Sequence, residues 1–155
     1  RFEALPAETR AKLPYRVRKD EVEFSFRGEL CGDQFSPEML EYVIAGPGKE
    51  YETLLTADAK EQRRLQPLKP YFTKHAGAGR GKRWSAQLIW VDGKEIGSLQ
   101  LADMLARIDA MERTQFLDEL EVNEQGLGGT KNLDAGRGAL PAKRLPAKVV
   151  LTLKL

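Results

Sequence analysis

The dipeptide Asp92-Gly93 is the feature that most limits how this chain can fold. It separates two apolar segments, and an Asp-Gly pair in that position is a strong signal for a tight β-hairpin, because glycine adopts positive φ without strain. We therefore predict a hairpin over Gln87–Leu101. In the segment before the turn, every second residue is apolar and would lie on the same face of a strand: Trp84, Ala86, Leu88 and Trp90. This period-2 pattern predicts a strand whose register points Trp84 into a core.

Further strands are expected on either side of this hairpin. Val22, Phe24 and Phe26 alternate with polar residues, which is the pattern of a half-buried strand. Two apolar runs within Met39–Thr56 flank the sequence GPGKE, and this arrangement predicts a second hairpin. The apolar residues at 148–155 predict a strand at the C-terminal end of the sequence.

Two short helices are expected between the strands. One covers Ala57–Leu65, where Asp58 is an N-cap residue and Pro67 marks the end. The other covers Ala102–Met111, because apolar side chains recur there at helical spacing. Residues 114–122 fit either an extension of this helix or a strand.

Together these elements predict a single α+β domain: a mostly antiparallel sheet with two or three short helices packed on one face. The two hairpins form the middle of the sheet. The expected parts, in chain order, are an N-terminal arm with a short helix (1–14), a core (22–122), an extended arm (125–147) and a terminal strand (148–155). No apolar run approaches the roughly 20 residues that cross a bilayer.

Charge is distributed in blocks along a chain whose net charge is only +2. Residues 60–83 carry eight Lys or Arg against one acid, whereas residues 112–124 carry five acids against one Arg. A net charge this small does not indicate nucleic-acid binding by itself. Blocks of alternating sign indicate either docking surfaces or ordinary solvated faces.

The arm at 125–147 is rich in glycine, proline and basic residues and shows no periodicity. Loops this long are uncommon in compact domains and are often functional. The arm should therefore lie against either its own domain or a neighbouring molecule, and we expect the neighbour. We also expect partner binding by basic residues of the arm and of the 60–83 segment. The predicted binding residues are Lys74, Arg80, Lys82, Arg83, Lys131, Arg137, Lys143 and Arg144.

The glycine-rich stretch YFTKHAGAGRGKRW, residues 71–84, is not a nucleotide-binding loop. A phosphate-binding P-loop needs a glycine at the position of Ala76 and a hydroxyl at the position of Arg83. The stretch also precedes an expected strand, whereas a phosphate loop precedes a helix. Its basic residues could contact RNA phosphates while an aromatic ring stacks on a base. That alternative competes with Trp84 being a core residue.

No catalytic or metal-binding constellation is evident, so neither an enzyme nor a cofactor is expected. His75 is the only histidine, and no acidic residue near it in the sequence would orient it as a base. Cys31 is the only cysteine, which excludes an internal disulfide, and we interpret it as a small residue at the edge of the core. Acidic pairs such as Glu21 and Glu23 lack the spacing of a calcium loop.

The segment LEYVIAGPGKEYETLLTADAKEQRRLQPL resembles the core of YdjY-like domains, which occur in exported bacterial proteins. The matching positions are Glu41-Tyr42-Val43-Ile44 and Gly48-Lys49-Glu50-Tyr51-Glu52-Thr53-Leu54-Leu55. The similarity extends over residues 22–108 and ends before the arm. It implies an exported, β-rich binding or accessory domain and supplies no catalytic residues.

These observations predict a non-catalytic accessory or structural subunit of a larger protein assembly. Export to the periplasm or cell envelope is expected, with an organellar matrix as the alternative, because the sequence starts at Arg1 and not at methionine. The alternative function is an RNA-associated protein, ribosome-bound or organellar, that contacts phosphates through the same basic residues. Salt dependence distinguishes the two, because phosphate contacts weaken steeply with salt.

Overall fold

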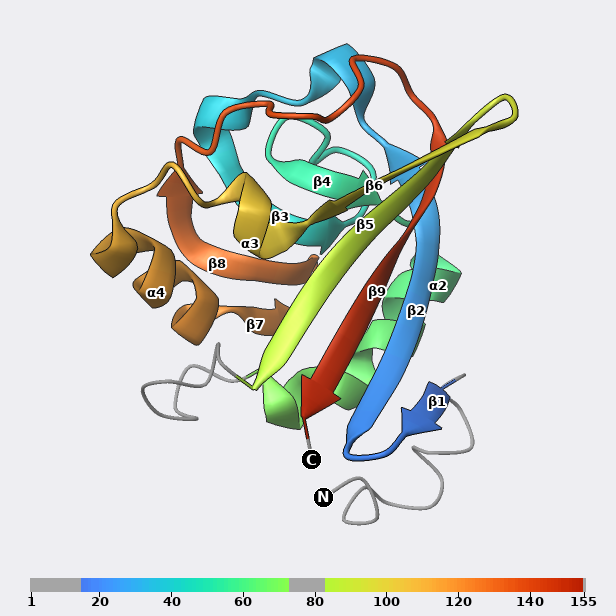
Figure 1. The fold of residues 1–155 in the computed structure, drawn as a ribbon, viewed down its shortest axis with the longest axis vertical. Helices are drawn as coiled ribbons and strands as arrows, with labels where there is room; N and C mark the ends of the chain where they lie inside the picture. Colours follow the sequence, from blue (N-terminus) through green and yellow to red (C-terminus); the bar gives the residue numbers. More distant parts are fainter. Residues whose placement is uncertain (1–14, 73–82, 155) are drawn as a thin grey trace.

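The computed structural model describes residues 15–72 and 83–154, and its main feature is one curved sheet (Figure 1). The strand order is β6-β5-β9-β2-β4-β3-β8-β7, and β1 pairs with β2 beside this path. The strands are β1 (Tyr15–Arg18), β2 (Glu21–Leu30), β3 (Leu40–Ala45), β4 (Thr53–Thr56), β5 (Trp84–Asp92), β6 (Glu95–Gln100), β7 (Glu121–Asn123), β8 (Gly126–Leu133) and β9 (Pro146–Lys154). The described part of the chain is thus an α+β domain with a mostly antiparallel sheet, as the sequence predicts.

Short helices connect the strands. The α-helices are α2 (Ala59–Leu65), α3 (Leu101–Met104) and α4 (Ala110–Glu119), and the 3-10 helices are η2 (Gly32–Gln34), η3 (Pro37–Met39) and η4 (Gln66–Tyr71). The predicted N-cap is confirmed, because the Asp58 side chain accepts a hydrogen bond from the Glu61 N–H at 2.9 Å. The predicted N-terminal helix lies outside the described residues. No described helix is long and apolar enough to cross a bilayer.

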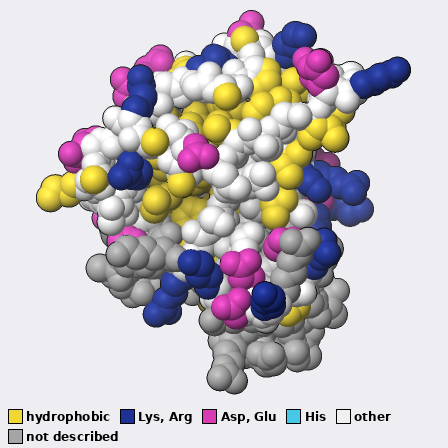
Figure 2. Space-filling model, viewed as in Figure 1, with side chains coloured by type: hydrophobic (Ala, Val, Ile, Leu, Met, Phe, Trp, Pro, Cys, Tyr) yellow, Lys and Arg dark blue, Asp and Glu magenta, His cyan; other side chains and the backbone are white. Residues whose placement is uncertain are grey.

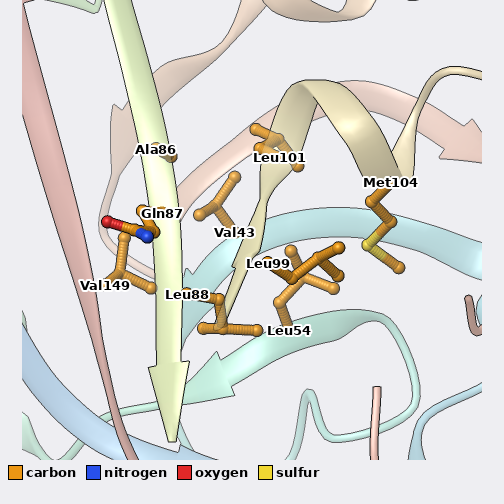
Figure 3. A pocket seen from close by; sticks show the side chains of 9 residues that line it. All are labelled: Val43, Leu54, Ala86, Gln87, Leu88, Leu99, Leu101, Met104 and Val149. Atoms are coloured by element: carbon orange, nitrogen blue, oxygen red, sulfur yellow. The ribbon is translucent and has the colours of Figure 1, made fainter. Parts of the chain in front are cut away.

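The core lies between two halves of the sheet that face each other. Val43 of β3 and Leu54 of β4 line the same small apolar pocket as Leu88 of β5 and Val149 of β9 (Figure 3). Met104 of α3 closes one side of this pocket. Strands that are distant in the sheet order therefore contact one another across the interior, so the curvature of the sheet creates the core.

The hairpin predicted at Asp92-Gly93 is confirmed, with the turn displaced by one residue. Asp92 pairs with Glu95, so Gly93 and Lys94 form the two-residue loop, and Gly93 has a φ of 63°. A positive φ confined to the first loop position is typical of a type II′ turn. The predicted burial alternation is also confirmed along β5, whose inward residues begin with Trp84 at 6% exposure.

The hairpin predicted over Met39–Thr56 is wrong, because β3 and β4 run parallel. After β3 the chain turns back along the strand, and the backbone N–H groups of Glu41 and Tyr42 both donate to the Glu52 carbonyl at 2.9 Å. Thr53 then lies beside Tyr42, and the chain runs again in its first direction. Both strands are buried almost throughout, as parallel strands are when both faces are covered.

The single helix predicted over Ala102–Met111 is also wrong. Helix α3 ends at Met104, and Asp109 then starts α4 by accepting hydrogen bonds from Met111 and Glu112. A new N-cap inside the apolar repeat breaks one helix into two. The alternatives for residues 114–122 are both realised, because α4 continues to Glu119 and β7 starts at Glu121.

The predicted arm is shorter than 125–147, because residues 126–133 form β8 between β3 and β7. The glycines of this segment are packing sites. A Cβ atom on Gly128 would lie 2.4 Å from Cδ1 of Tyr42, and one on Gly129 would lie 2.8 Å from Cε2 of Phe116. The strand can approach these rings only without side chains, so its glycines resemble a loop in the sequence.

Helix α2 fills a gap beside β2. On that edge β2 pairs with β1 up to Phe24 and with β4 from Glu29, and no described strand pairs with the residues between. There the Arg27 N–H donates to the Glu61 carboxylate at 2.9 Å, and the Arg64 guanidinium donates to the Ser25 carbonyl at 3.2 Å. Side chains of α2 thus satisfy backbone groups that a strand would otherwise satisfy.

Candidate interaction surface

The eight basic residues predicted to bind partners have different environments. Lys74, Arg80 and Lys82 lie outside the described residues. Arg83 directly precedes β5 with its side chain exposed, and its carbonyl accepts a hydrogen bond from the Lys154 N–H at 2.8 Å. Lys131 lies on β8, and Arg137, Lys143 and Arg144 lie between β8 and the start of β9.

Arg137 holds the arm to the body of its own domain. Its guanidinium donates to the carbonyls of Gly32 and Phe35 at 3.0 Å and to the carbonyl of Pro141 at 3.3 Å. It also lies over the Phe35 ring, with 5.9 Å between the guanidinium carbon and the ring centroid. These groups occupy the side chain, so Arg137 acts as an internal anchor in this fold.

Two more basic residues of the arm pair with acids of the same domain. Arg144 bonds the Glu29 carboxylate and donates to the Gln34 side-chain oxygen at 2.8 Å. Lys143 lies 3.3 Å from the Asp92 carboxylate, next to the hairpin turn. Both side chains are still about half exposed or more, so these pairs are weak ties on the surface.

Apolar side chains of the arm enter the core directly. Ala135, Leu140 and Leu145 are buried, and the Leu145 carbonyl accepts a hydrogen bond from the Leu30 N–H at 2.9 Å. The inner side of the arm therefore lies against its own domain, which is the alternative to the expected neighbouring molecule. The arm covers Cys31, a residue that is 2% exposed.

Lys131 and the segment around α2 also present basic side chains to solvent. Lys131 on β8 is exposed and lies 3.5 Å from the Gln115 side-chain oxygen. Lys60, Arg63 and Lys69 are exposed on α2 and η4, whereas Arg64 is held by Glu61. The 60–83 segment thus presents a basic surface over its described residues.

The outer face of β5, β6 and β9 presents apolar side chains to solvent. Val91 is 43% exposed and Ile96 is 74% exposed, and the two face each other across the hairpin. Ile89 and Val150 point to the same side and are half-buried. Figure 2, drawn in the orientation of Figure 1, shows a band of hydrophobic side chains over β5 and β9. We call these four residues the outer apolar face.

A sequence signal for this face was present. The run Leu88-Ile89-Trp90-Val91 is uninterrupted, as is Val149-Val150-Leu151, whereas a strand with one solvated face alternates. Continuous apolar runs are typical of strands that are covered on both sides. In the described part of the chain only the inner side of these strands is covered. Lys148 is the charged residue next to Ile89 on the outer side.

A second cluster that the sequence did not reveal surrounds the start of β4. The Glu52 carboxylate is 6% exposed, lies 3.2 Å from the Lys49 ammonium, and accepts a hydrogen bond from the Asn132 amide at 3.4 Å. Burial and the neighbouring Glu52 carboxyl raise the pKa of Glu41. The hydrogen bond to Glu52 raises the pKa of Lys49. Two acids share one cation here, and burial beside the second carboxyl favours the protonated form of Glu41.

This carboxyl cluster fixes the tight return between the two parallel strands. Its members come from β3, from the connection and from β8, and the Tyr42 hydroxyl beside it donates to the Gln125 side-chain oxygen at 2.6 Å. Glu41, Tyr42, Lys49 and Glu52 all belong to the segment Met39–Thr56, which the sequence predicted to be a hairpin. Their proximity could not be inferred while that segment was interpreted as a hairpin.

Burial, above all other causes, raises the pKa of the Cys31 thiol to about 11, so the thiol stays protonated at neutral pH. This agrees with the expectation of a core-edge residue. His75 lies outside the described residues. Among the described residues, no group of three or more His, Cys, Asp or Glu side chains could hold a metal ion.

Comparisons with known proteins identify no relative. No family model matches the chain, no curated protein matches it, and no solved structure matches its fold.

Proposed function

We propose that this protein is a non-catalytic accessory or structural subunit of a larger assembly, and that it binds other proteins through the outer apolar face. The observation that carries this proposal is the exposure of Val91 and Ile96 on strands whose apolar runs are continuous. Exposed apolar patches of this kind mark interaction sites on soluble domains. Basic side chains at its border, such as Lys148, would orient the partner.

The arm has a different role in this proposal from the one expected from the sequence. Its inner side completes the core, so only its outer side remains for partners. The exposed parts of Lys143 and Arg144, together with Lys131, supply charge at the rim of the binding surface. We propose export to the cell envelope as the setting, with an organellar matrix as the alternative, on the basis of the YdjY-like resemblance.

The test is a double variant, Val91→Lys with Ile96→Glu, in tagged protein purified from the cells that make it. The two substitutions place opposite charges across the hairpin, so the pair keeps its strand register. Because both sites are on the surface, the free energy of unfolding should change by no more than about 0.5 kcal/mol. The proteins that co-purify with the wild type should be lost. Retention of all of them would contradict the proposal.

An RNA-associated function is the second candidate, and the exposed side chains of Lys60, Arg63 and Lys69 favour it. Stacking by Trp84 is not available to it, because that ring is buried. Binding would therefore depend on phosphate contacts, and its affinity should fall with salt with a log–log slope of about 0.7 to 0.9 per contact. The matched variant replaces these three residues with glutamine. If this variant loses its partner while the Val91/Ile96 variant does not, the RNA function replaces the first proposal.

A further inference from the structure

We propose that β6 pairs with β6 of a second copy of this chain, in antiparallel orientation, so that the two sheets become one. This inference rests on the proposed function, since it names one partner in the assembly. The surface involved is the free edge of β6; it shares Ile96 with the outer apolar face, but it binds through backbone N–H and C=O groups, whereas the face binds through side chains. The occupant is another molecule of the same protein, related by a two-fold axis.

The first observation is that β6 is an accessible edge strand. It ends the strand order of the sheet, and its side chains are exposed or half-buried throughout. The hairpin that it forms with β5 extends beyond the rest of the fold (Figure 1). An edge of this kind presents unpaired N–H and C=O groups to any extended chain.

The second observation is that β6 carries few of the features that prevent edge pairing. Proline, internal lysine, bulges and covering loops are the usual protections. The sequence Glu95–Gln100 contains no proline or lysine, and its register with β5 runs unbroken from Glu95 to Gln100. Its single charge, Glu95, lies at the first position.

The turn determines which groups point outward. In a two-residue hairpin the residues flanking the loop, Asp92 and Glu95, form a hydrogen-bonded pair, and bonding then alternates along the ladder. Ile96, Ser98 and Gln100 therefore direct their backbone N–H and C=O groups away from β5. A two-fold axis at Ser98 pairs all three: Ser98 with Ser98 of the second copy, and Ile96 with Gln100 of the second copy in both directions.

Side chains and charges agree with this register. Ser98 is small and uncharged at the axis, so the two copies of its side chain lie side by side without steric or charge conflict. Lys94 at the hairpin tip would lie alongside the start of α3 of the second copy, where Asp103 is exposed. The two-fold axis creates this opposite-charge pair twice, and the register opposes no like charges within the strands.

The decisive experiment is self-crosslinking at the axis. A Ser98→Cys variant, treated with oxidised glutathione, should form a disulfide-linked dimer, because directly opposed residues of a hydrogen-bonded pair have Cα atoms about 5.5 Å apart. Ser85→Cys is the matched control, since Ser85 is exposed on the same sheet but on β5. The wild type should not crosslink through Cys31, which is buried.

Sedimentation over a concentration series supplies the second readout. Ser98→Lys brings two ammonium groups together at the axis and should raise the dimer dissociation constant about tenfold or more, whereas Ser85→Lys should leave it unchanged. If the wild type sediments as a monomer and Ser98→Cys does not crosslink, the inference is overturned. Protein partners that still depend on Val91 and Ile96 would then leave the proposed function standing. If they do not depend on these residues either, both proposals fail.

Discussion

Trp84 is the residue whose environment is most completely defined. Its ring packs edge-on against Phe72, with 5.3 Å between centroids and a 75° angle between planes, and it is 6% exposed. Trp84→Ala should lower the free energy of unfolding by about 3–5 kcal/mol, because it empties a large aromatic site. Thermal or urea unfolding measures this change.

The variant Trp84→Phe distinguishes the contribution of the aromatic ring to stability from that of the indole N–H group. The indole N–H of Trp84 is buried and has no hydrogen-bond partner in the described part of the chain. A phenyl ring removes this unsatisfied donor while keeping most of the contact area, so Trp84→Phe should lose well under half as much stability as Trp84→Ala. Equal losses for the two variants would mean that the N–H group has a partner after all.

Glu41 predicts a pH dependence of stability. Burial and the Glu52 carboxyl raise the pKa of Glu41 in the folded state, so folded Glu41 holds a proton that the unfolded chain releases. Stability therefore falls as pH rises from the unfolded pKa, about 4.3, through the folded pKa, and the full cost is present above it. Glu41→Gln should unfold at a higher temperature than the wild type at neutral pH, and this advantage should vanish below about pH 4. Glu38→Gln, at an exposed position, is the control.

An advantage of Glu41→Gln that stayed constant from acid to neutral pH would contradict this explanation. Such a result would mean that the amide improves packing and that the charge of Glu41 is not the cause. The melting temperatures of the three proteins across pH 3–8 decide between these explanations. Glu52 is less suitable for this test, because its loss would also remove the partner of Lys49 and Asn132.

At the scale of the elements, two substitutions distinguish a structural role from a binding role for the basic residues of the arm. Arg137 supplies hydrogen bonds to the carbonyls of Gly32 and Phe35, and the described residues offer these carbonyls no other donor. Arg137→Ala should therefore lower the free energy of unfolding by about 2–3 kcal/mol, the scale of a lost charged hydrogen bond. Lys131→Ala, on the exposed side of β8, should change it by no more than about 0.5 kcal/mol. Equal effects would contradict the assignment of Arg137 as an anchor.

The elements that the sequence predicted correctly are those that local chemistry determines. Trp84 and its alternating neighbours, the Asp92-Gly93 turn and the Asp58 cap depend on residues within a few positions of each other. The parallel pairing of β3 with β4 is not determined locally. It depends on distant parts of the chain that bury both faces of these two strands. The glycines of β8 likewise reflect the distant rings of Tyr42 and Phe116, which no local pattern reveals.

The candidate binding residues show the same limit. Basic residues and a lack of periodicity in the sequence indicated that the arm binds a partner. The structure shows instead that Arg137 donates hydrogen bonds to carbonyls of its own domain. The outer apolar face was visible as an unbroken apolar run over Leu88–Val91. Recognising it needed the pairing of β5 with β6 and β9, which shows what covers each side. A run of hydrophobic residues alone fits a core strand equally well.

At the scale of the molecule, β9 lies between β2 and β5 and joins them into one sheet. It pairs with β5 over seven positions, from Trp84↔Leu153 to Trp90↔Ala147, and with β2 from Glu21↔Lys154 to Glu29↔Pro146. Its inward residues Val149 and Leu151 are 1% exposed or less. Without β9, the β5–β6 hairpin has no pairing partner in the described sheet, and β2 loses the longer of its two edges.

Strand β9 should therefore control folding of the whole domain. Ending the chain at Ala147 should abolish cooperative unfolding and near-ultraviolet circular dichroism, because a central strand is missing and the core opens on both sides. In the untruncated chain, studied at concentrations low enough to keep it monomeric, hydrogen exchange should protect the β9 amides most strongly, close to the global free energy of unfolding, and the outward amides of β6 least. The two experiments check each other. A truncated chain that still unfolds cooperatively, or β9 amides that exchange as fast as those of β6, would show that the two halves of the sheet are held together by the interior contacts of Val43, Leu54 and Leu88 instead.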